Sequence, residues 1–364
     1  MDPRRFTGSH TCARRSLSLP QRPLFHDLSY SQLESDFAAR KLPAYRARQL
    51  WQGIYAHLLP SPYAITNLPA DLREQLEGIY TFDAFEIRET LQSTDGGTQK
   101  LLLALHDGAT IETVLMRYER RRTACISTQV GCAMGCVFCA TGQMGFGRNL
   151  SHGEIAAQVL LIGQMLAQEG DRLTNVVLMG MGEPFHNYEA SLAAIDLLND
   201  PDGFNFGARR FTISTVGIVP MIDRFTAEQR QVNLAVSLHA ATNTLRNQLL
   251  PINRRFPLED LMAACRRYVD TTHRRITFEW ALISDFNDQP EQARALTDWL
   301  HGMNSHVNLI PLNPTQGYAG GPSTRDRAAE FQRILQEASV SCTIRVRRGI
   351  DIQAGCGQLA SQAS

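Results

Sequence analysis

Residues 125–150 read Cys-Ile-Ser-Thr-Gln-Val-Gly-Cys-Ala-Met-Gly-Cys-Val-Phe-Cys-Ala-Thr-Gly-Gln-Met-Gly-Phe-Gly-Arg-Asn-Leu. They contain a C-x3-C-x2-C triplet formed by Cys132, Cys136 and Cys139, and four of the chain's eight cysteines fall within fifteen residues. Such crowding argues against a random scatter of buried thiols. Three thiolates at this spacing can bind three irons of a 4Fe-4S cluster and leave the fourth iron without a protein ligand.

An iron with an open position can bind the amino and carboxylate groups of S-adenosylmethionine (SAM). An electron from the cluster can then split the sulfonium and release a 5'-deoxyadenosyl radical. The triplet therefore predicts an iron-sulfur cluster, SAM and radical chemistry. The alternatives are a structural zinc site or a set of core thiols. Structural zinc usually closes four ligands, commonly as two separated pairs, and no second Cys or His pair matches.

The composition is that of a globular protein of 364 residues, which suits one α/β barrel with an appendage. The 36 basic and 36 acidic side chains cancel, so no global field attracts nucleic acid and any RNA site must be a local patch. No apolar run is long enough to cross a bilayer. Unevenly placed cysteines indicate a reducing compartment, and we expect a cytoplasmic monomer.

The chain divides by pattern into five parts. Residues 1–28 hold five arginines among Ser, Pro and Gly, and predict a flexible basic tail that includes Cys12. Residues 29–80 have helical apolar spacing and predict a helical accessory domain, expected to bind RNA. Residues 81–122 alternate like strands and predict a β linker. A barrel over 123–348 and a C-terminal tail over 349–364 complete the chain.

Strands and helices alternate through residues 123–348. The capping box Ser151-His-Gly-Glu154 opens the first helix. Candidate strands occupy 123–129, 175–179, 210–215, 232–238, 275–282, 306–312 and 342–346. Candidate helices occupy 188–198, 258–271, 289–301 and 324–338. Repeated βα units imply a parallel sheet, and about six units predict an α/β fold that closes as a (β/α)6-type barrel or partial barrel.

Reactive groups of such barrels gather at the carboxyl ends of the strands. Met179-Gly-Met-Gly-Glu-Pro184 offers a glycine turn and a carboxylate there, and the later strands end near Ser214, in Ser237-Leu-His-Ala240 and at Asn313. These groups could hold a ribose or a carboxylate. Singly they are weak signals, because such residues more often cap helices or form ordinary turns.

Two further cysteines, Cys125 and Cys356, are left unassigned by the sequence pattern. Cys125 shares a predicted strand face with Ser127 and Gln129, within roughly 23 Å of the cluster along the chain. Cys356 lies between two glycines, which give its thiol room to move. Cys342 and Cys265 lie on apolar faces and are assigned to packing.

These motifs closely resemble the RlmN/Cfr family of radical-SAM RNA methyltransferases, from the helical region to the final Cys-Gly-Gln-Leu. The resemblance implies a radical-SAM partial barrel with Cys132, Cys136 and Cys139 as cluster ligands. It implies SAM contacts at Gly182, Glu183, Ser214, Ser237, Leu238, His239 and Asn313. It further implies that Cys356 is the cysteine that becomes methylated, Cys125 its resolving partner through a transient disulfide, and Glu112 the proton acceptor.

The resemblance also implies a substrate and a reaction. One SAM would methylate Cys356, and a second would generate the radical that activates this methyl group for addition to C2 of an adenosine in 23S rRNA and in tRNA. Each turnover would need an external electron donor of the flavodoxin or ferredoxin type. Alternatives are methylation of C8, as in Cfr, a non-methylating iron-sulfur protein that binds RNA or senses redox state, and a radical-SAM enzyme acting on a metabolite.

Pairs of arginines are the candidate contacts to RNA phosphates. They comprise Arg117 with Arg120 to Arg122, and the pairs Arg209-Arg210, Arg254-Arg255, Arg274-Arg275 and Arg347-Arg348. Any one pair is more often an ordinary solvated surface. Their repetition predicts a one-sided basic patch.

Overall fold

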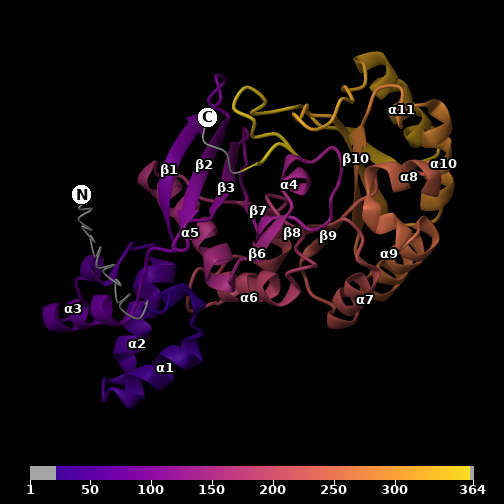
Figure 1. Cartoon of the computed structure of the whole chain (residues 1–364). Helices are drawn as coiled ribbons and strands as arrows, with labels where there is room; N and C mark the ends of the chain where they lie inside the picture. The colour runs from indigo at the N-terminus through magenta and orange to yellow at the C-terminus, as the bar shows by residue number, and fades with distance from the viewer. Residues whose placement is uncertain (1–21, 361–364) are drawn as a thin grey trace, which may run out of the picture.

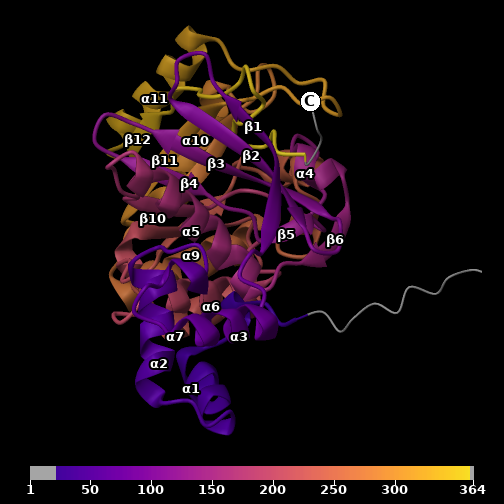
Figure 2. The ribbon, with the colours of Figure 1, turned by 90° about the vertical axis from the view of Figure 1, so that its left-hand side faces the viewer.

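The computed structural model describes residues 22–360. Its N-terminal module contains helices α1 (Tyr30–Ala39), α2 (Ala44–Trp51) and α3 (Ala70–Ile79). Apolar residues at helical spacing bury one face of each helix, and Pro43 and Pro69 occupy the N-cap positions of α2 and α3. These helices lie at one end of the molecule in both views (Figures 1 and 2).

The module begins earlier in the chain than predicted. Phe25, in a short 3-10 helix (Phe25–Asp27), is fully buried, and its ring lies 4.8 Å from that of Phe82 and 5.9 Å from that of Tyr55. The boundary predicted at residue 28 therefore falls inside packed structure. The rest of the predicted basic tail, residues 1–21 with Cys12, lies outside the described residues.

One ten-stranded sheet runs through the described chain in the order β1-β2-β3-β4-β7-β8-β9-β10-β11-β12. From β4 to β12 neighbouring strands pair in parallel, while β1 to β4 pair antiparallel. The bounds are β1 (Phe85–Gln92), β2 (Thr98–Leu105), β3 (Thr110–Arg117), β4 (Arg122–Cys125), β7 (Asn175–Leu178), β8 (Phe211–Thr215), β9 (Asn233–Ser237), β10 (Ile276–Leu282), β11 (Ser305–Pro311) and β12 (Ser341–Ile344).

Helices connect the parallel strands and lie outside the sheet (Figure 1). They are α5 (His152–Gln168), α6 (Tyr188–Asn199), α7 (Val219–Glu228), α8 (Asn243–Leu249), α9 (Leu258–Thr272), α10 (Pro290–Leu300) and α11 (Arg325–Glu337). The predicted α/β partial barrel is thus confirmed. The predicted linker strands are β1 to β3, and they extend the same sheet. No helix among residues 22–360 combines the length and hydropathy needed to span a membrane.

Three sequence predictions need correction. The strand predicted over 123–129 ends at Cys125, and Gln129 begins a separate hairpin of β5 (Gln129–Gly131) and β6 (Phe146–Asn149). Cys125 therefore shares no continuous strand face with Ser127 and Gln129. The last strand stops at Ile344 rather than Val346. Helices α7 and α8 were missed, since each is short and begins close after a strand.

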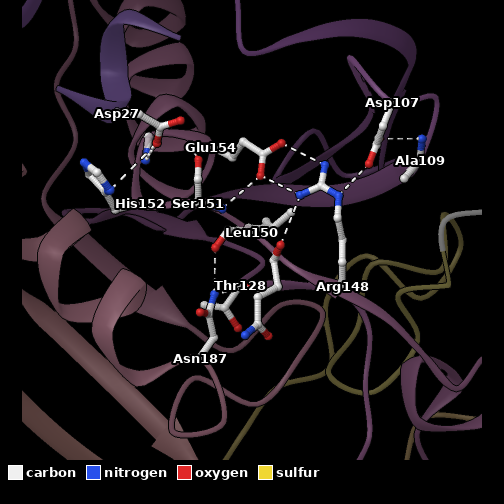
Figure 3. A network of polar contacts seen from close by, with 12 residues as sticks. Asp27, Asp107, Ala109, Thr128, Arg148, Leu150, Ser151, His152, Glu154 and Asn187 are labelled. Atoms are coloured by element: carbon white, nitrogen blue, oxygen red, sulfur yellow. Dashed lines mark hydrogen bonds and ion pairs between the residues drawn. The ribbon is translucent and has the colours of Figure 1, made fainter. Parts of the chain in front are cut away.

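Arg148 anchors the end of the cysteine stretch (Figure 3). Its guanidinium donates two hydrogen bonds of 2.8 Å to the carboxylate of Glu154 on α5, and its Nε donates one to Asp107 in the β2–β3 turn. Glu154 also accepts from the backbone N–H of Ser151, which confirms the predicted capping box. Nearby, the Asn187 amide donates to the carbonyls of Thr128 and Leu150 at 2.9 and 2.8 Å. The C-terminal end of the cysteine stretch is therefore held against α5 and the β2–β3 turn.

The C-terminal tail, residues 349–360, closes the open side of the partial barrel. It runs from the β12 side of the sheet across to β2 and β3, as the yellow trace in Figure 1 shows. The Asp351 carboxylate accepts hydrogen bonds from the N–H and hydroxyl of Thr94 at 2.8 and 3.1 Å. At the other end, the Ala360 N–H donates to the Glu112 carboxylate at 2.9 Å.

Candidate active site

A cavity of about 240 Å³ lies at the carboxyl ends of the parallel strands. Five cysteines line it: Cys125, Cys132, Cys136, Cys139 and Cys356. Cys265 and Cys342 are buried in the core away from it, in agreement with the packing role expected for them. The cavity therefore gathers thiols from the cysteine stretch, the end of β4 and the C-terminal tail.

The triplet occupies a loop between β5 and helix α4 (Ala140–Gln143). Cys132 N–H donates to the Gly145 carbonyl at 2.8 Å, and Cys139 N–H donates to the Cys136 carbonyl at 3.1 Å. Gly131 has a φ of +70°, and a Cβ there would lie 2.0 Å from the Gly145 oxygen. A glycine is therefore required where this loop turns back.

The three thiols could hold an iron-sulfur cluster. Burial raises the pKa of Cys132 to about 12, with Glu183 and Cys139 adding to the effect, and burial also raises the pKa of Cys136. Thiolates gathered in this way need a cation beside them, and soft sulfur ligands suit iron.

Glu183 lies on the wall of the cavity, at the end of the glycine turn after β7. Its carboxylate accepts hydrogen bonds from the N–H groups of Val216 and Phe185 at 2.8 and 3.0 Å. Burial raises its pKa to about 7, although these hydrogen bonds favour the charged form. Gly182 has a φ of +104°, and a Cβ there would meet the Gln129 side chain at 2.6 Å. The turn therefore places the Glu183 carboxylate and the backbone of Gly182, which has no side chain, at the cavity wall.

His239 has a defined protonation state. The Ala281 N–H donates to its Nδ1 at 2.9 Å, and burial lowers the imidazole pKa to about 3. The ring is therefore neutral, and its proton lies on Nε2. The Phe138 ring packs edge-on against it at 4.9 Å between centroids. His239 can offer one N–H donor to a ligand in the cavity.

Asn313 carries an open acceptor. Its Nδ2 donates to the Cys356 carbonyl at 3.0 Å, whereas its buried Oδ1 has no hydrogen-bond partner. A buried amide oxygen without a partner is unfavourable unless a ligand donor completes it. Ser214 and Ser237 also line the cavity. These polar groups fit the hydroxyl and amino donors of a molecule such as SAM.

Cys125 and Cys356 approach each other across the cavity. Burial raises the pKa of Cys125 strongly, and the neighbouring Cys356 adds to the effect. Part of Cys356 is open to solvent, yet the cavity walls around its sulfur raise its pKa to about 11, and Glu279 contributes. Both thiols are free in the structure.

Two predicted site residues lie outside the cavity lining. Leu238 is buried, and its carbonyl accepts from Arg246 Nε at 3.1 Å. Glu112 is buried on β3, where its carboxylate pairs with Lys100 at 2.8 Å. Val114 and Met116, on the same face of β3, do line the cavity. Glu112 thus lies just beyond the cavity edge, beneath the tail.

Sequence reasoning missed two groups of the cavity. Glu279, on β10, is buried, accepts from Asn308 Nδ2 at 2.9 Å, and has a pKa raised by burial. The sequence feature that could have identified Glu279 is a single acidic residue within an otherwise apolar strand. Arg345 also lines the cavity and forms no ion pair among the described residues. It follows β12, where the sequence pattern gave no reason to single out one arginine.

Comparisons with known proteins agree with this geometry. The model of the Radical SAM superfamily matches residues 126–296. A probable dual-specificity RNA methyltransferase RlmN 2 of Opitutus terrae is 46% identical over 97% of this chain and 91% of its own. A dual-specificity RNA methyltransferase RlmN 1 of Myxococcus xanthus is 49% identical over 92% and 93%.

A solved structure shares the whole architecture. It is a radical SAM methyltransferase from Sphaerobacter thermophilus, with a TM-score of 0.92 and 47% identity. The match covers 93% of this chain and all of that one. Identity at this level over nearly the full length shows common descent and common fold. The chain belongs to the RlmN family of the radical SAM superfamily.

Proposed function

We propose that this protein methylates C2 of an adenosine in 23S rRNA and in tRNA through a methylated Cys356. The observation that carries the proposal is the meeting of Cys356 and Cys125 in the same cavity as the cysteine triplet. The relatives named above as dual-specificity RNA methyltransferases support RNA as the substrate. A cluster and SAM alone, as a radical-SAM enzyme acting on a metabolite would use them, do not account for this second pair of thiols.

Cys132, Cys136 and Cys139 would hold a 4Fe-4S cluster, and the polar wall of the cavity would hold SAM. When bound, the two supply a methyl group and a radical that abstracts hydrogen. Glu183 suits the SAM amine, because its carboxylate is already oriented by two backbone donors. His239 Nε2 and Asn313 Oδ1 provide one donor and one acceptor for the rest of the molecule.

Residues of the protein itself then transfer the methyl group to the base. The Cys356 thiolate accepts a methyl group, and loss of one hydrogen from it leaves a carbon radical that bonds to C2 of the adenine. Glu112 accepts the ring proton, and the unpaired electron of the adduct would pass to the oxidised cluster that the triplet would hold. The Cys125 thiolate then attacks the Cys356 sulfur and forms a disulfide, while the bond from sulfur to the new carbon breaks and that carbon takes up a proton to become the methyl group. An external electron donor of the flavodoxin or ferredoxin type would reduce this disulfide.

The residues around Tyr118 are the best-supported candidates for contact with RNA. The guanidinium carbons of Arg121 and Arg348 lie 4.4 and 4.8 Å from the centre of its ring, and Tyr118 and Arg348 both line the cavity. Aromatic and guanidinium planes can stack on bases, and the charges attract phosphate. The Arg209-Arg210 and Arg274-Arg275 pairs precede β8 and β10 and do not line the cavity.

Identification of the methylated base tests the proposal. RNA exposed to the reconstituted enzyme, SAM and reductant is digested to nucleosides, which are separated and compared with authentic standards. We expect 2-methyladenosine. Recovery of 8-methyladenosine alone would establish the C8 alternative instead. If the Cys356→Ala variant keeps the protein's function, this result would support the alternative in which the protein binds RNA or senses redox state without methylating a base.

A further inference from the structure

Lysine is almost absent from this chain. Only two of its 36 basic residues are lysines, Lys41 and Lys100. Lys41 is exposed at the end of α1, whereas Lys100 is buried on β2 with only 6% of its surface exposed. Nearly all basic residues of this chain are arginines, yet the buried position on β2 has a lysine, whose ammonium group is compact. Arginine is bulkier and presents a planar fork, so the two are not equivalent there.

The partner of Lys100 is Glu112. Lys100 Nζ lies 2.8 Å from Glu112 Oε1, and both side chains are nearly inaccessible to solvent. Neither residue forms another ion pair within residues 22–360. A buried ion pair adds little net stability, yet removal of one partner leaves an uncompensated charge that is strongly unfavourable. The position of each group therefore depends on the other.

The pair also contacts the tail on both sides of Cys356. Lys100 Nζ lies 3.5 Å from the carbonyl of Gln353, and Glu112 Oε2 accepts the Ala360 N–H at 2.9 Å. Each oxygen of Glu112 thus has one contact while the tail is docked, Oε1 with Lys100 and Oε2 with Ala360. These two contacts fix the orientation of the carboxylate and leave a second lone pair on each oxygen.

We infer that Lys100 is a positioning residue that couples Glu112 to the docked tail of Cys356. Lys100 holds Glu112 as an oriented carboxylate, and Glu112 in turn fixes Ala360. Oε2, on the side of the tail, has a second lone pair that can take the ring proton while Oε1 remains on the ammonium group. The inference rests on the proposed function for the roles of Glu112 and Cys356, but the contacts that it explains exist without SAM or RNA.

Hydrogen exchange of the tail tests the coupling in the reconstituted full-length enzyme without SAM or RNA. Lys100→Met should raise exchange in a peptide covering 353–360 by roughly tenfold or more. Lys41→Met, at the exposed lysine, is the matched control and should leave it unchanged. Exchange of the β10 peptide 276–282 reports global stability in each variant. Equal tail protection in Lys100→Met and Lys41→Met would overturn the inference.

A double variant separates coupling from simple loss of stability. Lys100→Met with Glu112→Gln removes both buried charges, and the glutamine oxygen can still accept from Ala360. We expect tail protection to return, even if Lys100→Met alone fails to fold. A double variant that folds, with a protected β10 peptide but an unprotected tail, would contradict the coupling.

The reaction provides a readout that a purely structural lysine would not change. Lys100→Gln, with Cys356 already methylated, should raise the isotope effect of deuterium at C2 of the adenosine on the single-turnover rate, because a displaced Glu112 slows removal of the ring proton. An unchanged isotope effect would contradict a role in proton transfer. Failure of the proposed function itself would appear differently, as an unmethylated Cys356 in the parent enzyme.

Discussion

Thr141 donates a side-chain hydrogen bond of 2.6 Å to the carbonyl of Leu359. Thr141 belongs to the short helix that follows Cys139, and Leu359 lies three residues beyond Cys356. The neighbouring Ala140 N–H donates to the Gly357 carbonyl at 2.8 Å. The loop proposed to hold the cluster and the tail proposed to accept the methyl group therefore share one set of contacts.

Removal of the cluster should loosen the tail. Without iron, the three thiols lose their common partner and α4, only four residues long, loses its support. Chelation under reducing conditions should therefore accelerate alkylation of Cys356, measured by mass spectrometry of its peptide. Buried Cys265 serves as the control and should stay protected. Unchanged alkylation of Cys356 would show that the tail docks independently of the cluster.

Gly182→Ala should be strongly destabilising. Its φ of +104° disfavours a side chain, and the added Cβ would lie 2.6 Å from Gln129 Cβ and 2.8 Å from Gln129 N. We expect a loss of about 1–3 kcal/mol in the free energy of unfolding, measured by chemical denaturation. Gly78→Ala, in α3 with nothing within 4 Å of the new methyl group, should be neutral or stabilising.

The fold should lose stability in mild acid. The pKa of His239 falls from 6.5 to about 3 on burial, so between these values the unfolded chain binds a proton that the folded chain does not. The free energy of unfolding should therefore decrease as pH falls from 6.5 towards 3. His239→Asn, whose amide oxygen can accept from Ala281, should flatten this dependence. An identical slope in parent and variant would exclude His239 as its source.

The Tyr118 cluster should affect RNA binding rather than methylation of Cys356. Tyr118→Ala should weaken RNA binding by about 1–3 kcal/mol if a base stacks there, while Tyr118→Phe retains it. Arg348→Gln should lower the slope of log K against log salt by about 0.7. Arg333→Gln, in a surface pair with Glu337, is the control for loss of one charge. Unchanged affinity in Tyr118→Ala would place the RNA elsewhere.

The sequence predicted the barrel well, because alternation of buried strands and amphipathic helices reports local geometry. It placed α9 and α11 within a residue at each end. It failed where the chain leaves regular pairing, as at Cys125, where β4 stops and the backbone turns towards β5. Nothing in the alternating pattern of 123–129 marks that break.

The candidate site was predictable where one short motif carries the chemistry, as for Cys132, Cys136 and Cys139. Interactions between distant segments were not. The pairing of Lys100 with Glu112 depends on the register of β2 against β3, where Leu102 lies opposite Glu112. Glu279 lines the same cavity as the tail, which returns from the far end of the chain.

The role of Cys356 as methyl carrier is tested by the mass of the Cys356 peptide after anaerobic reconstitution and incubation with SAM. We expect one added methyl group on Cys356 in the Cys125→Ala variant, where the resolving thiol is missing. Labelled methyl from SAM should appear on Cys356 and on no other cysteine. A Cys356 that stays unmethylated in a fully reconstituted enzyme would contradict the mechanism.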